Sequence, residues 1–113
     1  MRKGKEARSA AAVQKAWTDE LKDRDRTLAL FYADWCPFSR RFLPHFEAYA
    51  EAHPGECRIV EAEADPDACD AFDIDVYPSV LEFRNGRLEK RLDGIPGFGL
   101  SRQQLEEFCS KAP

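Results

Sequence analysis

The residues best suited to covalent chemistry are a cysteine and a serine at neighbouring turn positions, Cys36 and Ser39. They follow an apolar run that ends at Trp35, and a segment with helical spacing begins there. A thiol at the start of a helix meets unpaired backbone N–H groups and the positive end of the helix dipole, which favour the thiolate. A thiolate can attack a disulfide, but one thiol cannot by itself resolve the mixed disulfide that forms. The pattern predicts a site that captures sulfur partners more readily than it releases them.

The residues around this thiol are expected to modify its chemistry. Pro37, at the first helical position, removes one N–H that would otherwise face the sulfur. The hydroxyl of Ser39 is expected to donate a hydrogen bond to the sulfur instead. Arg40 and Arg41 add positive charge nearby, whereas Asp34 opposes it. These neighbours predict net support for a thiolate.

The other cysteines and the two histidines give weaker functional signals. Cys57 starts an expected strand and Cys109 lies on the inward face of an expected helix, so both are interpreted as core residues. His45 or His53 could form a Cys–His hydrolase pair, but no oxyanion motif accompanies them. The chain has no C-x-x-C pair and only two histidines, so no metal site is predicted. Reduced thiols in a cytoplasm are the default expectation.

Length and composition predict one globular domain without a membrane span. The 113 residues are 43% hydrophobic and 34% charged, and the net charge of −4 argues against nucleic acid or an anionic membrane as the main partner. No apolar run approaches the ~18 residues of a span. We expect a flexible tail over 1–6 and a single domain over 7–113, monomeric and cytoplasmic. A mature secreted form stays open as an alternative.

Hydrophobic periodicity predicts alternating helices and strands in an α/β fold. Helices are expected over about 7–22, 36–52, 66–72 and 102–111, with the second interrupted by Pro44. Strands are expected over about 27–33, 57–64, 79–83 and 87–92, and Asn85-Gly86 is a hairpin turn between the last two. The order of elements implies a mixed sheet with helices on both faces.

Taken in order, these motifs resemble the thioredoxin family. The motifs are the turn from Trp35 to Ser39, Pro44 eight residues after Cys36, Tyr77-Pro78 before a strand, the hairpin Arg84 to Arg87, and Gly94. The resemblance covers roughly residues 10–110. It implies a thioredoxin-like sheet of about four strands flanked by helices on both faces, without the family's usual N-terminal strand, because the first eight residues are polar.

The resemblance also implies roles for individual residues. Cys36 and Ser39 would be catalytic, and Pro78 would be cis, which exposes the backbone of Tyr77 to an extended substrate chain. The implied substrate-binding residues are Trp35, Pro37, Phe38, Tyr77, Pro78 and Gly94. The alternatives are a trans proline, a Trp35 packed in the core, and a Cys36 that is a small hydrophobe beneath it. Cys69, on the active-site side, is a candidate redox partner thiol, although a buried core cysteine is the more common explanation.

Two departures from the family pattern agree with each other. Ser39 stands where dithiol members have their resolving cysteine, and Leu30 stands where they have a buried acid that relays protons. The resemblance therefore implies a monothiol thiol–disulfide oxidoreductase that forms mixed disulfides through Cys36 and contributes to redox homeostasis. Its partners would be protein thiols or disulfides, with no cofactor beyond an external thiol such as glutathione. The alternative is a redox-inactive or chaperone-like module that binds proteins through Trp35 and Tyr77-Pro78.

Overall fold

The computed structural model describes residues 8–110. The helices are α1 (Ala10–Leu21), α2 (Pro37–Ala52), α3 (Pro66–Ala71) and α4 (Arg102–Ser110). The strands are β1 (Thr27–Tyr32), β2 (Cys57–Glu61), β3 (Ser79–Arg84) and β4 (Arg87–Asp93). The tail predicted over 1–6 and the last residue of the predicted C-terminal helix, Lys111, lie outside the described residues.

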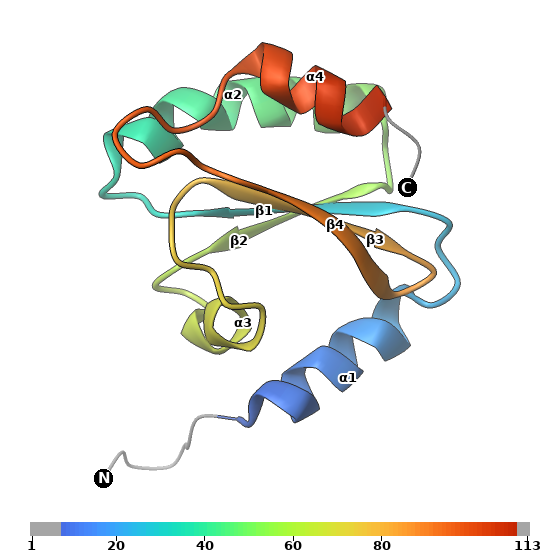
Figure 1. The fold of residues 1–113 in the computed structure, drawn as a ribbon. Coiled ribbons are helices and arrows are strands. Elements are labelled where there is room, and N and C mark those ends of the chain that lie inside the picture. Colours follow the sequence, from blue (N-terminus) through green and yellow to red (C-terminus); the bar gives the residue numbers. More distant parts are fainter. Residues whose placement is uncertain (1–7, 111–113) are drawn as a thin grey trace, which may run out of the picture.

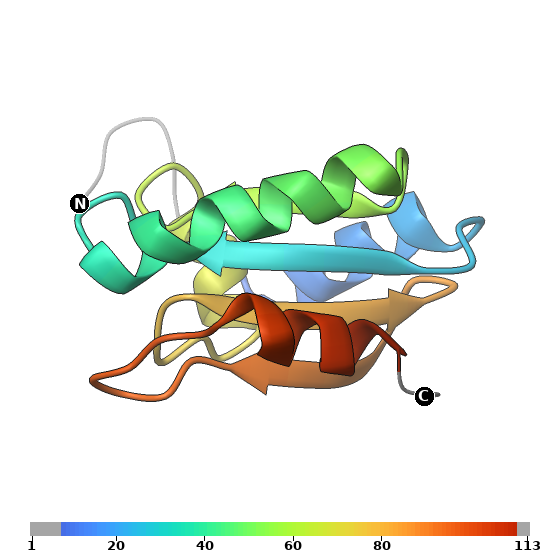
Figure 2. The same ribbon diagram turned by 90° about the horizontal axis from the view of Figure 1, so that it is seen from above.

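The predicted mixed four-stranded sheet is confirmed. The strand order is β2-β1-β3-β4, with β1 parallel to β2 and antiparallel to β3, and β3 antiparallel to β4. Helices α2 and α4 cover one face and α1 and α3 lie on the other (Figure 1). The connections β1–α2, α3–β3 and β4–α4 gather at one end of the sheet (Figures 1 and 2). That end is where the chemistry-bearing residues must be sought.

The central strand β1 is buried on both faces, as its unbroken apolar run predicts. Phe31 packs on the α1 side, 5.8 Å from the ring of Trp17, in an aromatic cluster that also holds Phe72 and Phe83. Leu30 points to the opposite side, into the apolar cluster beneath α2 and α4. Leu30, which stands where dithiol members of the family have a buried acid, is therefore packed in the apolar core.

Two predicted elements differ in detail from the structure. β2 ends at Glu61 instead of continuing to about residue 64, because the Glu61 carboxylate accepts hydrogen bonds from the amides of Glu63 and Ala64 and turns the chain. Helix α2 was predicted to be interrupted at Pro44, but it is one continuous helix with Pro44 exposed. The proline ring therefore sits on the solvent side of the helix, where it displaces no packed neighbour.

The β3–β4 hairpin turns at Asn85 and Gly86, both with positive φ, as predicted. Gly86 also abuts α1, because a Cβ built on it would lie 2.6 Å from the Thr18 carbonyl oxygen. The Thr18 hydroxyl donates a hydrogen bond to the Gly86 carbonyl oxygen, 3.1 Å away. This glycine therefore meets two requirements, a left-handed backbone and a close approach to a helix.

Gly86→Ala is expected to lower the free energy of unfolding by about 3 kcal/mol, since the left-handed φ and the overlap with Thr18 both oppose a side chain. Gly97→Ala is the matched control, because Gly97 has nearly the same φ and nothing within 4 Å of a built Cβ. Its expected cost is about 1 kcal/mol. Urea unfolding of both variants measures the difference, and equal costs would contradict the packing argument.

Within residues 8–110, no helix combines the length and apolarity needed to cross a membrane. In the same part of the chain, no three side chains of metal-ligating type gather into a possible metal site.

Candidate active site

The turn between β1 and α2 is organised by the backbone of Ala33. Its carbonyl oxygen accepts the Cys36 amide at 3.0 Å, and its amide donates to the Ser39 hydroxyl oxygen at 3.2 Å. Cys36 is the N-cap residue of α2, and its carbonyl oxygen accepts the first helical bond, from the Arg40 amide. The amides of Phe38 and Ser39 precede that bond and have no acceptor within the helix. They therefore lie in the positively polarised first turn that Cys36 opens.

Ser39 has a different hydrogen-bond role from the predicted one. Its side chain is fully buried, and its hydroxyl oxygen accepts from the Ala33 amide. Among the described residues, its hydroxyl forms no hydrogen bond to the Cys36 sulfur. Ser39 thus fixes the shape of the turn, and its contribution to the thiol is indirect.

The Cys36 thiol lies against the backbone of the β3 entrance. It is 7% exposed and donates to the Tyr77 carbonyl oxygen, with 3.8 Å between the two atoms. The Tyr77-Pro78 peptide bond is cis, as the family resemblance implies. The structure therefore brings Cys36, Tyr77 and Pro78 together, although 41 residues separate the thiol from its acceptor in the sequence.

Two glycines allow the loop after β4 to close against this site. A Cβ built on Gly94 would lie 2.5 Å from the Pro78 carbonyl oxygen, so only glycine fits there. A Cβ on Gly99 would lie 2.8 Å from the Phe38 Cβ, at a φ of +76°. Gly94 was predicted as a site residue, but Gly99 was not. The sequence Gly97-Phe98-Gly99 predicts a loop. It does not indicate that Gly99 contacts α2, so the role of Gly99 could be found only from the structure.

Exposed apolar side chains lie in the turn that precedes α2 and in the loop after β4. Trp35 is 62% exposed and packs edge-on against Tyr77, with 6.2 Å between ring centroids. The interpretation of Trp35 as a core residue is therefore wrong. The interpretation of Cys36 as a small hydrophobe stays an alternative, since Cys36 itself is buried. Ile95 and Phe98 are also exposed, Phe98 at 75%. We call Trp35, Ile95 and Phe98 the apolar rim.

Cys69 is buried on α3 and faces a different part of Tyr77. Its thiol interacts with the Tyr77 phenol, whereas the Cys36 thiol donates to the Tyr77 carbonyl oxygen. Burial raises the pKa of the Cys69 thiol, an effect that the nearby phenol opposes. The two sulfurs are thus linked through one tyrosine, and the thiol of Cys69 is mostly protonated at neutral pH.

The remaining cysteines pack on the α2 and α4 side of the sheet, half-buried against the apolar cluster there. Burial raises the pKa of the Cys57 thiol to about 11 and also raises the pKa of Cys109. Their interpretation as core residues agrees with this placement. Neither is suited to act as a nucleophile at neutral pH.

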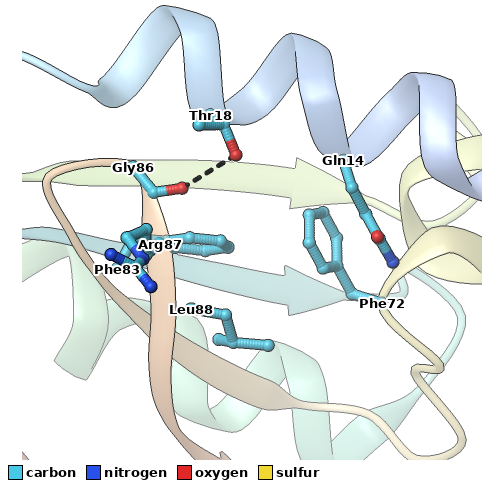
Figure 3. Close-up of a pocket in the computed structure, with 7 residues that line it drawn as sticks. All are labelled: Gln14, Thr18, Phe72, Phe83, Gly86, Arg87 and Leu88. Carbon is cyan, nitrogen blue, oxygen red and sulfur yellow. Dashed lines mark hydrogen bonds between the residues drawn. The ribbon is translucent and has the colours of Figure 1, made fainter.

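Another cavity, of about 220 Å³, opens between α1 and the β3–β4 hairpin (Figure 3). It is lined by Gln14, Thr18, Phe72, Phe83, Gly86, Arg87 and Leu88. The Thr18 hydroxyl is already bonded to Gly86, and no cysteine or histidine lines this cavity. It therefore carries no nucleophile and is not the candidate active site.

Comparisons with known proteins agree with this geometry. The family model described as Thioredoxin matches residues 8–110. Protein disulfide-isomerase A5 from Mus musculus is 32% identical over 81 residues, which cover 66% of this chain and 16% of that protein. Endoplasmic reticulum resident protein 44 from Homo sapiens is 38% identical over 79 residues, which cover 63% of this chain and 20% of that protein. The chain thus spans a fifth or less of the length of these relatives.

A solved structure shows the same fold. The structure of Fasciola hepatica thioredoxin superposes with a TM-score of 0.71 at 22% identity, covering 87% of this chain and 89% of that one.

Proposed function

This chain belongs to the thioredoxin family, and from that premise we propose that it is a thiol–disulfide oxidoreductase of the monothiol type. The observation that carries the proposal is the Cys36 thiol, which opens α2 beside the Tyr77 carbonyl group while a buried serine holds the fourth position of the turn. The relative named protein disulfide-isomerase supports the same class of chemistry.

The proposed reaction begins when the Cys36 thiolate attacks one sulfur of a disulfide. The new bond joins Cys36 to that sulfur, and the other sulfur leaves as a thiolate that takes a proton from water. Ser39 cannot continue the exchange, because a hydroxyl is not a sulfur nucleophile. An external thiol such as glutathione then attacks the mixed disulfide and restores Cys36. Through this cycle the protein would contribute to redox homeostasis.

An intramolecular resolving role for Cys69 is less well supported. Its thiol is buried, its pKa is raised, and it faces the phenol of Tyr77 rather than Cys36. We therefore assign resolution to a thiol from solution. Partner proteins would supply the disulfide, and their backbone would pair with the backbone at Tyr77. The cytoplasmic location and the monomeric state stay predictions.

Reaction with oxidised glutathione tests the proposal. At pH 7 the adduct is expected on the Cys36 peptide first, and excess reduced glutathione should remove it. Cys57 and Cys69 are expected to react more slowly because burial raises their pKa values. As the pH rises toward 11, the thiolate fraction of Cys57 grows, so its labelling should accelerate. Mass spectrometry of the four cysteine peptides reads out each rate.

The matched variant for this experiment is Cys36→Ser, which should form no adduct at pH 7 at the turn peptide. A total adduct yield that is the same with and without Cys36 would sink the proposal, as would labelling of Cys57 ahead of Cys36.

A second candidate function is non-covalent holding of partner proteins. It is favoured by the apolar rim, where Trp35 and Phe98 are largely exposed although the neighbouring thiol is buried. Partner capture that persists in Cys36→Ser and fails in Trp35→Ala would favour this function over disulfide exchange.

A further inference from the structure

The two sides of the candidate active site carry opposite charge. On the α3 side, the stretch from Ile59 to Phe83 contains no lysine or arginine but many acids. The Glu61 carboxylate accepts from the Asp34 amide at 3.4 Å, so this charge reaches the turn that holds Cys36. Asp70 lies close enough to influence the phenol of Tyr77. A client chain that crosses the thiol on this side therefore passes the carboxylates of Glu61 and Asp70.

On the opposite side lies a pocket of about 340 Å³ between α2, the loop after β4 and the start of α4. Its cationic or ionisable lining consists of Arg41, His45 and Arg102, and the exposed side chains of Ile95 and Phe98 supply an apolar wall. The pocket adjoins the first turn of α2, which Cys36 opens, since its residue Gly99 abuts Phe38 there. We call it the basic pocket.

The guanidinium groups of the basic pocket are available to a ligand. Arg41 is exposed and stacks over the Phe38 ring at 5.3 Å, and within residues 8–110 it forms no ion pair. Arg102 pairs with Glu106 at 3.6 Å, but both side chains are more than 60% exposed. Such an exposed pair contributes little, so a carboxylate from a ligand can replace it at low cost. Guanidinium groups bind carboxylates through paired hydrogen bonds.

From this arrangement we infer that the basic pocket is a subsite for an acidic side chain of the client protein, a few residues from the cysteine that Cys36 captures. The inference rests on the proposed function and adds a substrate class to it. Charge complementarity selects the occupant: a carboxylate is attracted to Arg41 and Arg102, whereas the same carboxylate placed on the α3 side is repelled by Glu61 and Asp70. The apolar wall accommodates the aliphatic part of the acidic side chain.

The test measures the rate at which Cys36 reacts once with synthetic peptides. Each peptide has one cysteine, which carries a 2-thiopyridyl group. Cys36 attacks the peptide sulfur, forming the mixed disulfide and releasing 2-thiopyridone, whose absorbance reports the rate. The peptides place a glutamate either before or after the cysteine, with glutamine at the same positions as the neutral reference. One glutamate placement should react about three- to tenfold faster than its glutamine reference at low salt, and added salt should reduce the gain.

The variant Arg41→Gln with Arg102→Gln should abolish that gain, measured in each protein as the ratio of the glutamate rate to the glutamine rate, so that any effect of Arg41 on the Cys36 thiolate itself cancels. The charge-matched control, Lys22→Gln with Arg87→Gln, removes two cations that do not line the basic pocket and should preserve the gain. Equal rates for the glutamate and glutamine peptides, or a gain that survives the pocket variant, would overturn the inference.

Two further outcomes separate this inference from its premise. No release of 2-thiopyridone from any peptide through Cys36 would refute the proposed function itself. The pocket variant is also compared with the natural chain in its reaction with oxidised glutathione. If its rate falls there as much as it does with glutamate peptides, the pocket binds the carboxylates of glutathione, and the assignment to a client protein is overturned.

Discussion

Ser39→Cys is expected to convert the protein from one that stops at a mixed disulfide into one that completes the exchange. With an aromatic disulfide such as dithiobis(2-nitrobenzoate), the natural chain should end with one aryl thiol attached to Cys36. The variant should release that second aryl thiol and end with an internal disulfide. The two positions lie three residues apart at the start of α2, where helix geometry places the Cα atoms about 5 Å apart, within the range that a disulfide spans.

The rate of this second step should be large because the introduced thiol attacks within the same molecule. Leu30 is buried in the apolar cluster and offers no base for the proton of that thiol. The step is therefore expected to accelerate as the pH approaches the ordinary thiol pKa of about 8.5. Intact-protein mass spectrometry against time follows the appearance and loss of the adduct.

Ser101→Cys is the control for Ser39→Cys, because it adds a thiol at the start of α4 rather than in the turn. It should leave the adduct on Cys36 in place. An adduct equally persistent in both variants would show that position 39 cannot reach the sulfur, contrary to the geometry of the turn.

The sequence predicted the parts of the site that belong to recognisable motifs. It did not predict the hydrogen-bond partners that side chains acquire when the chain folds. Cys36, Tyr77 and Gly94 belong to ordered motifs, and the structure brings them together around Pro78. The partner of Ser39 was not predictable, since Ala33 offers only a backbone amide that any residue would carry. The same holds for the end of β2, which depends on how one carboxylate, that of Glu61, folds back on the chain.

Glu82 is the clearest case of a residue whose importance the sequence does not signal. In the strand pattern it is one polar residue between apolar neighbours, and its side chain is fully buried in the structure. Its carboxylate contacts Arg84 at 2.8 Å, Arg26 at 3.3 Å and Lys90 at 3.7 Å. Glu82 is buried because α4 packs over β3 and β4, an arrangement that the strand pattern does not indicate.

The cluster around Glu82 connects the sheet to the end of α4. Arg26 also donates to the Cys109 carbonyl oxygen at 2.8 Å, and Lys90 donates to the Phe108 carbonyl oxygen at 2.9 Å. These carbonyl groups lie in the last turn of the helix, where no backbone N–H of the helix is available to donate to them. Two cations at that end also complement the helix dipole. Glu82 thus neutralises the cations that hold α4 on the sheet.

Glu82→Gln is expected to lower the free energy of unfolding by about 3 kcal/mol, because it leaves three partly buried cations without the buried carboxylate that neutralises them. Urea unfolding measures the change, and Glu89→Gln, at an exposed position of β4, is the matched control with an expected effect below about 0.5 kcal/mol. Because the Glu82 carboxylate is buried, added salt should reduce the difference between the two variants only slightly. Equal stabilities would mean that the apolar cluster alone holds α4. A large loss would show that the helix closing the basic pocket is held by charge at its far end.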